Sequence, residues 1–251
     1  MSERNLVLCE IGTTGIEGLE SFSPYCLKVH RALRASGLRY TSRHGRMPAE
    51  FKELNPAAQV PVLLVDEEPV ADSTRILGRL GELAPGALEP KDPRARAEAW
   101  LWEEWADRAL GPFVVAARWA DARNWPAVHD AFFGGAPWFV RKLIAPAIRR
   151  RVIRGLERDA LRAGHVALWT DFRRILDLLE ARAPHRGFWL GDALTVADIG
   201  LFALLRSLRT DLTRWQSREI ELRPALVDWL DRVDARTRSP REAVVALRRA
   251  S

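Results

Sequence analysis

The sequence predicts an α+β protein in which an N-terminal domain with the element order βαβαββα precedes an all-α domain. Short strand-like and helix-like patterns alternate over residues 1–85, whereas the chain beyond residue 94 consists of long Ala/Leu/Arg/Trp-rich segments with few β-branched runs. All ten Trp residues lie beyond residue 99. The formal charge is −1 over residues 1–85 and +7 over the remainder. Halves of such different composition predict two domains.

The first elements follow from local patterns. Residues 5–11 form a short, loosely alternating apolar run that predicts a strand, and residues 12–23, rich in Gly, Ser and Thr, predict a loop. A helix should then begin with Ser23 as its N-cap and Pro24 at its first position, where the missing N–H costs nothing. Gly37 ends this helix, and residues 38–44 predict a second strand.

The remaining N-terminal elements are equally short. A helix or turn before Asn55-Pro56 precedes an apolar, β-branched strand at residues 60–66 and a further strand at 70–72. Residues 73–83 place their apolar side chains on one helical face. Three prolines within residues 84–94 predict a linker. We therefore expect domains at 1–85 and 95–251, joined by a linker at 86–94.

The cysteine count and the lack of several motifs limit the function. Cys9 and Cys26 are the only cysteines, so no disulfide framework is expected and a reducing compartment fits best. No apolar run is long enough for a signal peptide or a membrane span, and we expect a cytoplasmic protein. The sequence has no G-x-S-x-G motif, no phosphate-binding loop and no Cys/His spacing typical of a metal site.

One short motif points to thiol chemistry. Ser23-Pro24-Tyr25-Cys26 has the form of a redox C-x-x-C motif in which serine replaces the first cysteine. A helix N-terminus stabilises a thiolate through its backbone donors and its dipole. Serine forms no disulfide, but its hydroxyl can donate a hydrogen bond to a thiolate. Cys26, one turn into the helix, is interpreted as a small buried packing residue, with a reactive thiol as the alternative.

Two further motifs lie at strand and helix ends. A proline at the start of a central strand, as in Gln59-Val60-Pro61, needs a reason, because it removes a ladder hydrogen bond. A cis peptide that turns the backbone toward a ligand is one reason, and an ordinary trans proline at an edge strand is the alternative. Asp72-Ser73 begins the next helix, where unpaired N–H groups bind anions. Asp72 beside an ammonium group and Ser73 beside a carboxylate would suit an α-amino acid, while plain helix capping is the alternative.

The C-terminal half carries a structural motif. Thr195 and Asp198 have the spacing of a capping box, and Leu194 and Ile199 that of a hydrophobic staple. We assign this motif to helix stability and not to chemistry.

In this order the motifs resemble the glutathione S-transferase superfamily. The residues that carry the resemblance are Ser23-Pro24-Tyr25-Cys26 with Lys28-Val29, Asn55-Pro56, Gln59-Val60-Pro61-Val62-Leu63, Asp72-Ser73 and Leu194-Thr195-Val196-Ala197-Asp198. The resemblance implies a thioredoxin-like N-terminal domain, glutathione as co-substrate and a homodimer. It also implies that Gln59, Val60, Pro61, Asp72 and Ser73 bind glutathione, and that Ser23 is the catalytic hydroxyl. The implied reaction is conjugation of glutathione to a small hydrophobic electrophile.

Two segments depart from the common pattern. The loop before Ser23 is about ten residues longer than is usual, and residues 132–165 form a long segment between helices. Both features are similar to the metaxin and failed-axon-connections branch, which is not known chiefly for transferase chemistry. The alternatives are a non-catalytic binding or scaffold module of the same fold and a glutathione-dependent thiol-disulfide reductase using Cys26.

A basic stretch and three tryptophans complete the candidates. Residues 141–162 contain eight Arg or Lys against two acids, with apolar residues at helical spacing. We favour a solvated or partly interfacial face, with contact to acidic lipid or attraction of an anionic substrate as the alternatives. We expect no nucleic-acid binding, because no recognised fold for it is present. Trp102, Trp105 and Trp119 lie on the helix expected to face the cleft. We expect most of them in the core, with one or two lining a pocket for an apolar electrophile.

Overall fold

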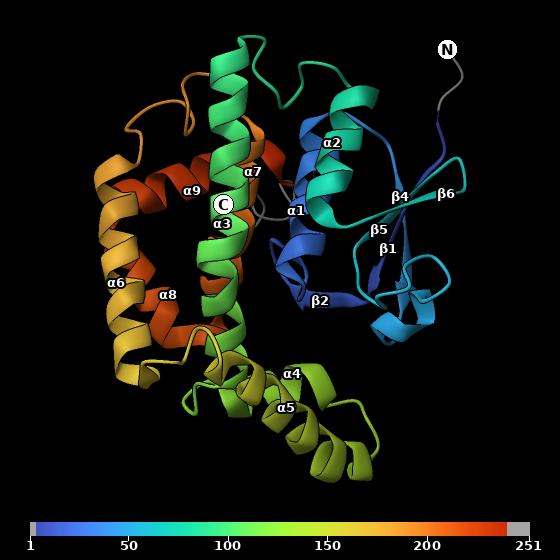
Figure 1. The fold of residues 1–251 in the computed structure, drawn as a ribbon, viewed down its shortest axis with the longest axis vertical. Coiled ribbons are helices and arrows are strands. Elements are labelled where there is room, and N and C mark those ends of the chain that lie inside the picture. The colour runs from blue at the N-terminus through green and yellow to red at the C-terminus, as the bar shows by residue number, and fades with distance from the viewer. Residues whose placement is uncertain (1–3, 240–251) are drawn as a thin grey trace, which may run out of the picture.

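The structure is a computed structural model that describes residues 4–239. Its N-terminal part contains a four-stranded mixed sheet in the order β4-β1-β5-β6, in which β1 pairs parallel with β4 and the other two pairings are antiparallel. The helices α1 (Pro24–Ala35) and α2 (Ser73–Leu83) lie between this sheet and the helical part (Figure 1). The strands are β1 (Leu6–Ile11), β4 (Thr41–Gly45), β5 (Val62–Val65) and β6 (Glu68–Ala71). The predicted thioredoxin-like arrangement is confirmed.

The segment predicted as a loop before Ser23 contains a hairpin. Strands β2 (Thr13–Ile16) and β3 (Leu19–Ser21) pair antiparallel as a separate two-stranded sheet. The Thr14 hydroxyl donates to the carbonyl of Leu19 and accepts from the N–H of Ile16 at 2.9 Å. Strands of three and four residues are too short for an alternating pattern to distinguish them from a loop. The hairpin leads directly into α1, against which β3 packs.

The rest of the described chain is helical, as predicted. The helix α7 is buried almost all round, and it packs against α1 and α3. The bounds are α3 (Pro93–Trp119), α4 (Trp125–Phe133), η2 (Val140–Ile144), α5 (Ala145–Glu157), α6 (Gly164–Arg182), α7 (Val196–Leu208), η3 (Asp211–Thr213), α8 (Arg214–Glu221) and α9 (Pro224–Thr237). The ends of the two expected domains, residues 1–3 and 240–251, lie outside the described residues.

The capping box forms as predicted and joins three elements. Asp198, fully buried at the start of α7, accepts hydrogen bonds from the N–H and hydroxyl of Thr195 at 2.9 and 3.0 Å. It also accepts from the N–H of Trp189 at 2.7 Å and from Nε1 of Trp229 at 3.0 Å. A buried carboxylate needs such donors, because burial without them would be costly.

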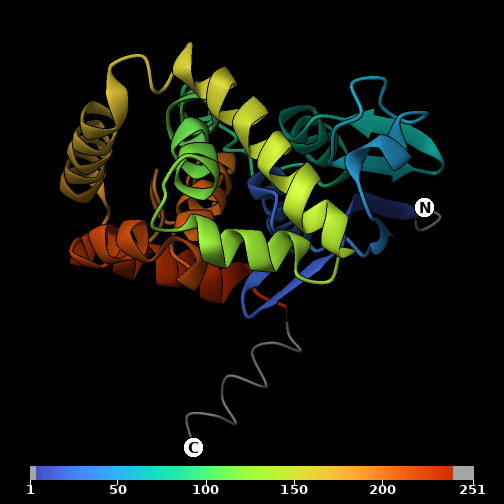
Figure 2. The same cartoon turned by 90° about the horizontal axis from the view of Figure 1, so that it is seen from below.

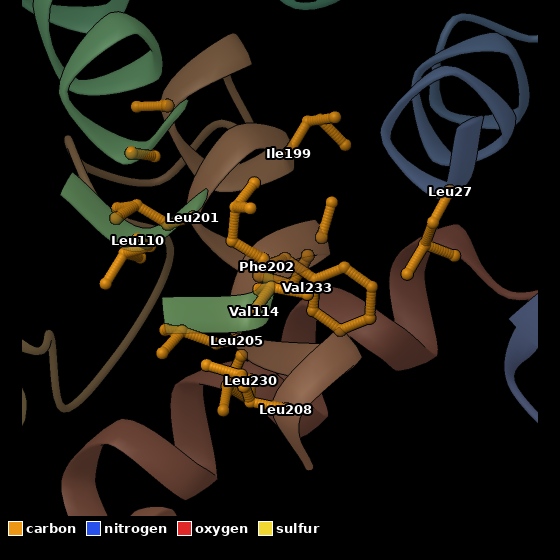
Figure 3. Packing of buried hydrophobic residues seen from close by; sticks show 14 of the residues in the cluster. Leu27, Leu110, Val114, Ile199, Leu201, Phe202, Leu205, Leu208, Leu230 and Val233 are labelled. Atoms are coloured by element: carbon orange, nitrogen blue, oxygen red, sulfur yellow. The ribbon is translucent and has the colours of Figure 1, made fainter. Parts of the chain in front are cut away.

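One hydrophobic core connects the two parts. It runs from β1 and α1 into the helices α3, α7 and α9, and Figure 3 shows Leu27 of α1 facing Phe202 of α7 and Val233 of α9. A second, smaller cluster of Cys9, Phe51 and Val62 lies between the sheet and the turn η1 (Pro48–Phe51). None of the helices between residues 4 and 239 is long and apolar enough to cross a bilayer.

Candidate functional site

A cleft of about 850 Å³ lies between the N-terminal part and α3. One wall comes from α1, the segment before β5 and the start of α2, and the other comes from α3. The residues that line it are Tyr25, Asn55, Ala57, Gln59, Val60, Pro61, Ala71, Asp72, Ser73, Thr74, Arg75, Glu104, Asp107 and Arg108. All five predicted binding residues are therefore together in one cleft.

The segment before β5 presents its backbone to this cleft. The Val60–Pro61 peptide bond is cis, so the cis interpretation of the proline is confirmed. Pro61 precedes the central strand β5, whose Val62 pairs with Cys9 on one side and Ala71 on the other. Asn55 holds the preceding turn, because its side-chain amide donates to the carbonyl of Gln59 at 2.9 Å. The polar backbone next to Pro61 is thereby kept at the cleft.

The start of α2 supplies the charged end of the cleft. Asp72 is the N-cap and accepts from the N–H of Arg75 at 3.1 Å, so the plain capping interpretation holds, although Asp72 also lines the cleft. It has φ of 80°, a conformation uncommon outside glycine and often found at ligand sites. Ser73 is nearly buried beside it. Arg75 makes no ion pair with any residue in the range 4–239, which leaves its charge available to a ligand.

The predicted catalytic serine caps α1. Ser23 Oγ accepts from the N–H of Cys26 at 3.3 Å, and Ser23 is not among the residues that line the cleft. Accepting that bond leaves the hydroxyl hydrogen as a donor, and the Ser23 hydroxyl is also within hydrogen-bond reach of the Cys26 side chain. Cys26 is fully buried, and burial raises the pKa of its thiol to about 12. Cys9 is also buried and free, and burial raises its thiol pKa as well. The packing interpretation of Cys26 fits this geometry, and Cys9 is buried in the same way.

Tyr25 is the α1 residue that reaches the cleft, and sequence reasoning overlooked it. Its hydroxyl lies against Gly111 of α3, where a Cβ would approach the phenol oxygen to 2.8 Å. Burial, with the nearby carboxylates of Asp107 and Asp72, raises the pKa of Tyr25 to about 12. The phenol is therefore protonated at neutral pH and can donate a hydrogen bond. Tyr25 is part of the Ser23-Pro24-Tyr25-Cys26 motif, but only the fold shows that its side chain lies at the cleft.

A buried charge cluster lies beneath the cleft. Lys28 Nζ contacts Glu103 Oε1 at 2.5 Å and Asp107 Oδ2 at 2.7 Å, and the Thr74 hydroxyl donates to Glu103 Oε1 at 3.0 Å. Burial raises the pKa of both carboxyl groups, while Lys28 opposes that effect. One cation shared by two acids connects α1 and α2 to α3 and fixes the floor of the cleft.

A buried arginine holds the segment that leads into Ser23. Arg118 of α3 donates to the carbonyl of Phe22 and, at 3.0 Å, to that of Ser207. No carboxylate within residues 4–239 pairs with it, and burial alone lowers its pKa to about 10. The guanidinium is therefore a positive charge without a carboxylate partner among the described residues, and it binds the carbonyl of the residue that precedes Ser23.

Trp102, Trp105 and Trp119 do not line the cleft, and the lining of an electrophile pocket by one or two of them stays a prediction. Trp102 packs on Trp105 and Trp189, whereas Trp119 packs on Phe132 of α4 with ring centroids 5.8 Å apart. Phe132 in turn stacks on Phe22 at 4.6 Å. Phe22, Phe132 and Trp119 thus form one aromatic surface, and Phe22 directly precedes Ser23 in the chain.

The fold and the cleft define a thioredoxin-like domain with a cis-proline site. Helix α3 of the following helical domain forms the opposite wall of that site. The glutathione S-transferase N-terminal domain model matches residues 22–83, and the corresponding C-terminal domain model matches residues 95–232. The chain belongs to the glutathione S-transferase family, as the motifs indicated.

Individual relatives agree with this assignment. The chain is 25% identical over 229 residues to the isoprene-epoxide–glutathione S-transferase of Rhodococcus sp. strain AD45, covering 86% of this chain and 93% of the relative. It is 27% identical over 196 residues to protein LigF of Sphingobium sp., covering 74% of each. The crystal structure of the β-etherase LigF shares its fold with a TM-score of 0.64 at 24% identity, covering 98% of this chain and 100% of that one. The protein is a glutathione S-transferase-like enzyme.

Proposed function

We propose that this protein binds glutathione in the cleft and transfers its sulfur to a small hydrophobic electrophile. The observation that carries the proposal is the meeting of the cis Val60–Pro61 backbone with Asp72 and Ser73 in one cleft. A solved relative from Pseudomonas fluorescens, 19% identical with a TM-score of 0.59 over 93% of this chain and 92% of its own, contains two bound glutathione molecules. That relative supports glutathione as the co-substrate.

The groups of the cleft match the charges of the tripeptide. The γ-glutamyl ammonium group would pair with Asp72, and the neighbouring carboxylate would accept from Ser73 and from the free N–H groups at the start of α2. The backbone beside Pro61, with Gln59 and Val60, would hold the cysteinyl residue by main-chain hydrogen bonds. Arg75 offers a cation for a carboxylate of the same ligand.

The reaction begins with loss of the glutathione thiol proton to solvent. The Ser23 hydroxyl donates to the resulting thiolate while its oxygen caps α1, and the dipole of α1 and the charge of Arg118 favour the anion. The thiolate then forms a carbon–sulfur bond and breaks a bond of the electrophile. Two relatives are named for an epoxide and for ether cleavage, which supports a carbon–oxygen bond as the one broken, with the oxygen taking a proton from solvent.

Tyr25 is a second candidate for this hydroxyl. It lines the cleft, whereas Ser23 does not, and its phenol stays protonated at neutral pH. The electrophile would pack on the aromatic surface of Phe22, Phe132 and Trp119.

A homodimer, a cytoplasmic location and a resemblance to the metaxin and failed-axon-connections branch remain predictions.

The alternatives have weaker support. A thiol-disulfide reductase using Cys26 needs an accessible thiolate, but this thiol is buried with its pKa raised to about 12. A non-catalytic scaffold of the same fold would not need the polar groups that converge on the cleft.

Isothermal titration with glutathione tests the proposal. We expect an affinity in the micromolar to millimolar range, and Asp72→Ala should weaken it at least tenfold, about 1.4 kcal/mol. Asp66→Ala, an exposed acid outside the cleft, serves as the matched control and should leave affinity unchanged. The proposed glutathione site would be contradicted if the wild type gave no binding heat, or if Asp72→Ala bound glutathione as tightly as the wild type.

A further inference from the structure

A surface at the end of the α4–α5 hairpin combines exposed apolar and basic side chains. The hairpin projects from the lower end of α3 (Figure 1), and in Figure 2, seen from below, α5 runs across the front of the molecule. We name this surface the apolar–basic patch. Its apolar members are Trp138, Phe139, Leu143, Ile144 and Ile148, and its basic members are Lys142, Arg150, Arg151 and Arg154.

The apolar side of the patch faces solvent. Of the eleven large apolar side chains that are exposed among residues 4–239, five belong to this patch within residues 138–148. Trp138 is 71% exposed and Leu143 is 64% exposed. Single exposed apolar residues are ordinary, but a contiguous group marks an interaction site. This exposure differs from a solvated polar face, which was the simplest interpretation of the sequence.

The charges of the patch are unbalanced. Residues 131–156 carry six Arg or Lys and no acid. Arg149 is occupied, because it donates to the carbonyl of Trp119 and covers the Trp125 ring. Arg141 lies 3.9 Å from Asp130. The four basic members of the patch form no ion pair with any residue that the structure describes. Their charge is therefore available to an anionic partner.

Helical spacing brings the two kinds of side chain onto one face. Arg151 follows Ala147 by four residues and Ile148 by three, and Arg154 follows Arg151 by three. All four residues are exposed. Along α5 the exposed side chains change from apolar at Ile148 to basic at Arg151 and Arg154, and all three are exposed to solvent. One flat partner can therefore contact both parts at once.

We propose that the apolar–basic patch binds the surface of an anionic phospholipid membrane. Aromatic and aliphatic side chains next to Arg and Lys are what such a surface accommodates, with the former at the acyl boundary and the latter at the phosphates. A second copy of this chain is disfavoured, because a two-fold contact would oppose two sets of unpaired cations. A nucleic acid would use the basic part and leave Leu143 and Ile148 exposed.

Vesicle co-sedimentation of the full chain tests the proposal. With phosphatidylserine-containing phosphatidylcholine vesicles at about 0.15 M salt we expect binding, and with pure phosphatidylcholine vesicles at least tenfold weaker binding. Trp138→Ser with Leu143→Ser should reduce binding at least tenfold, and Arg150→Glu with Arg151→Glu should do so as well. Part of the wild-type binding should persist at about 0.5 M salt, because apolar contacts are not screened.

Matched controls separate the patch from general effects. Leu222→Ser alters an equally exposed leucine elsewhere, and Arg94→Glu with Arg96→Glu produces the same charge change at the start of α3. Both should bind as the wild type does, and thermal unfolding should show that every variant is folded. The proposal is overturned by absence of binding to the anionic vesicles or by equal binding of patch and control variants. Sedimentation that instead reveals a dimer lost in Leu143→Ser would assign the patch to a second copy and also overturn it.

Discussion

Replacing Ser23 by alanine tests whether this hydroxyl stabilises the glutathione thiolate. A hydrogen bond to a charged acceptor contributes about 1.5–3 kcal/mol. At 1.36 kcal/mol per unit, its loss should raise the pKa of the bound thiol by about one to two units. Conjugation below that pKa should fall by about tenfold to a hundredfold. The substitution also removes the α1 cap, whose 3.3 Å bond to Cys26 is long, so a loss of about 1 kcal/mol in stability should accompany it.

The assay is the thiolate absorbance of bound glutathione against pH, together with conjugation of a model aryl halide. Ser23→Thr retains the hydroxyl and should keep a pKa near that of the wild type. Tyr25→Phe removes the other candidate hydroxyl and is the critical comparison. If Tyr25→Phe raises the pKa by one to two units while Ser23→Ala does not, Tyr25 is the donor. If Cys26→Ala abolishes turnover and both hydroxyl variants retain it, the protein's own sulfur reacts and the proposed mechanism is wrong.

Two further predictions concern buried groups. Because burial raises the Cys26 pKa from 9.0 to about 12, its proton binds more tightly in the folded state, so the free energy of unfolding should fall as pH rises through that range. Cys26→Ala should reduce this alkaline loss in chemical denaturation, and iodoacetamide should label Cys26 at pH about 8 only after unfolding. Lys28→Met should lower stability by about 3–5 kcal/mol, because it leaves Glu103 and Asp107 buried without their cation. Arg174→Met removes the cation of an exposed ion pair and should change stability by less than about 1 kcal/mol. If the Lys28→Met and Arg174→Met variants had equal melting temperatures, the buried cluster would not contribute as expected.

Local interactions allowed the sequence to predict much of this protein. The start of α1 at Pro24, the extent of α2 and the capping box at Thr195 all depend on residues within one helical turn, whereas the sequence left the cis and trans forms of the bond before Pro61 open. The ordered motifs also identified the family and five of the residues that line the cleft from the N-terminal side, namely Gln59, Val60, Pro61, Asp72 and Ser73. The β2–β3 hairpin was missed because its strands are too short to carry a period.

Only the tertiary structure decided which distant residues meet and which faces remain exposed. Lys28 and Glu103 are 75 residues apart, and no local pattern records their contact. Tyr25, and not Ser23, lines the cleft, and its hydroxyl lies against Gly111 of α3, which no local pattern records. A helical period likewise shows that Ile148 and Arg151 share a face, but it cannot say whether that face is covered. Burial depends on the packing of whole elements, so it is a property of the assembled fold and not of the neighbouring sequence.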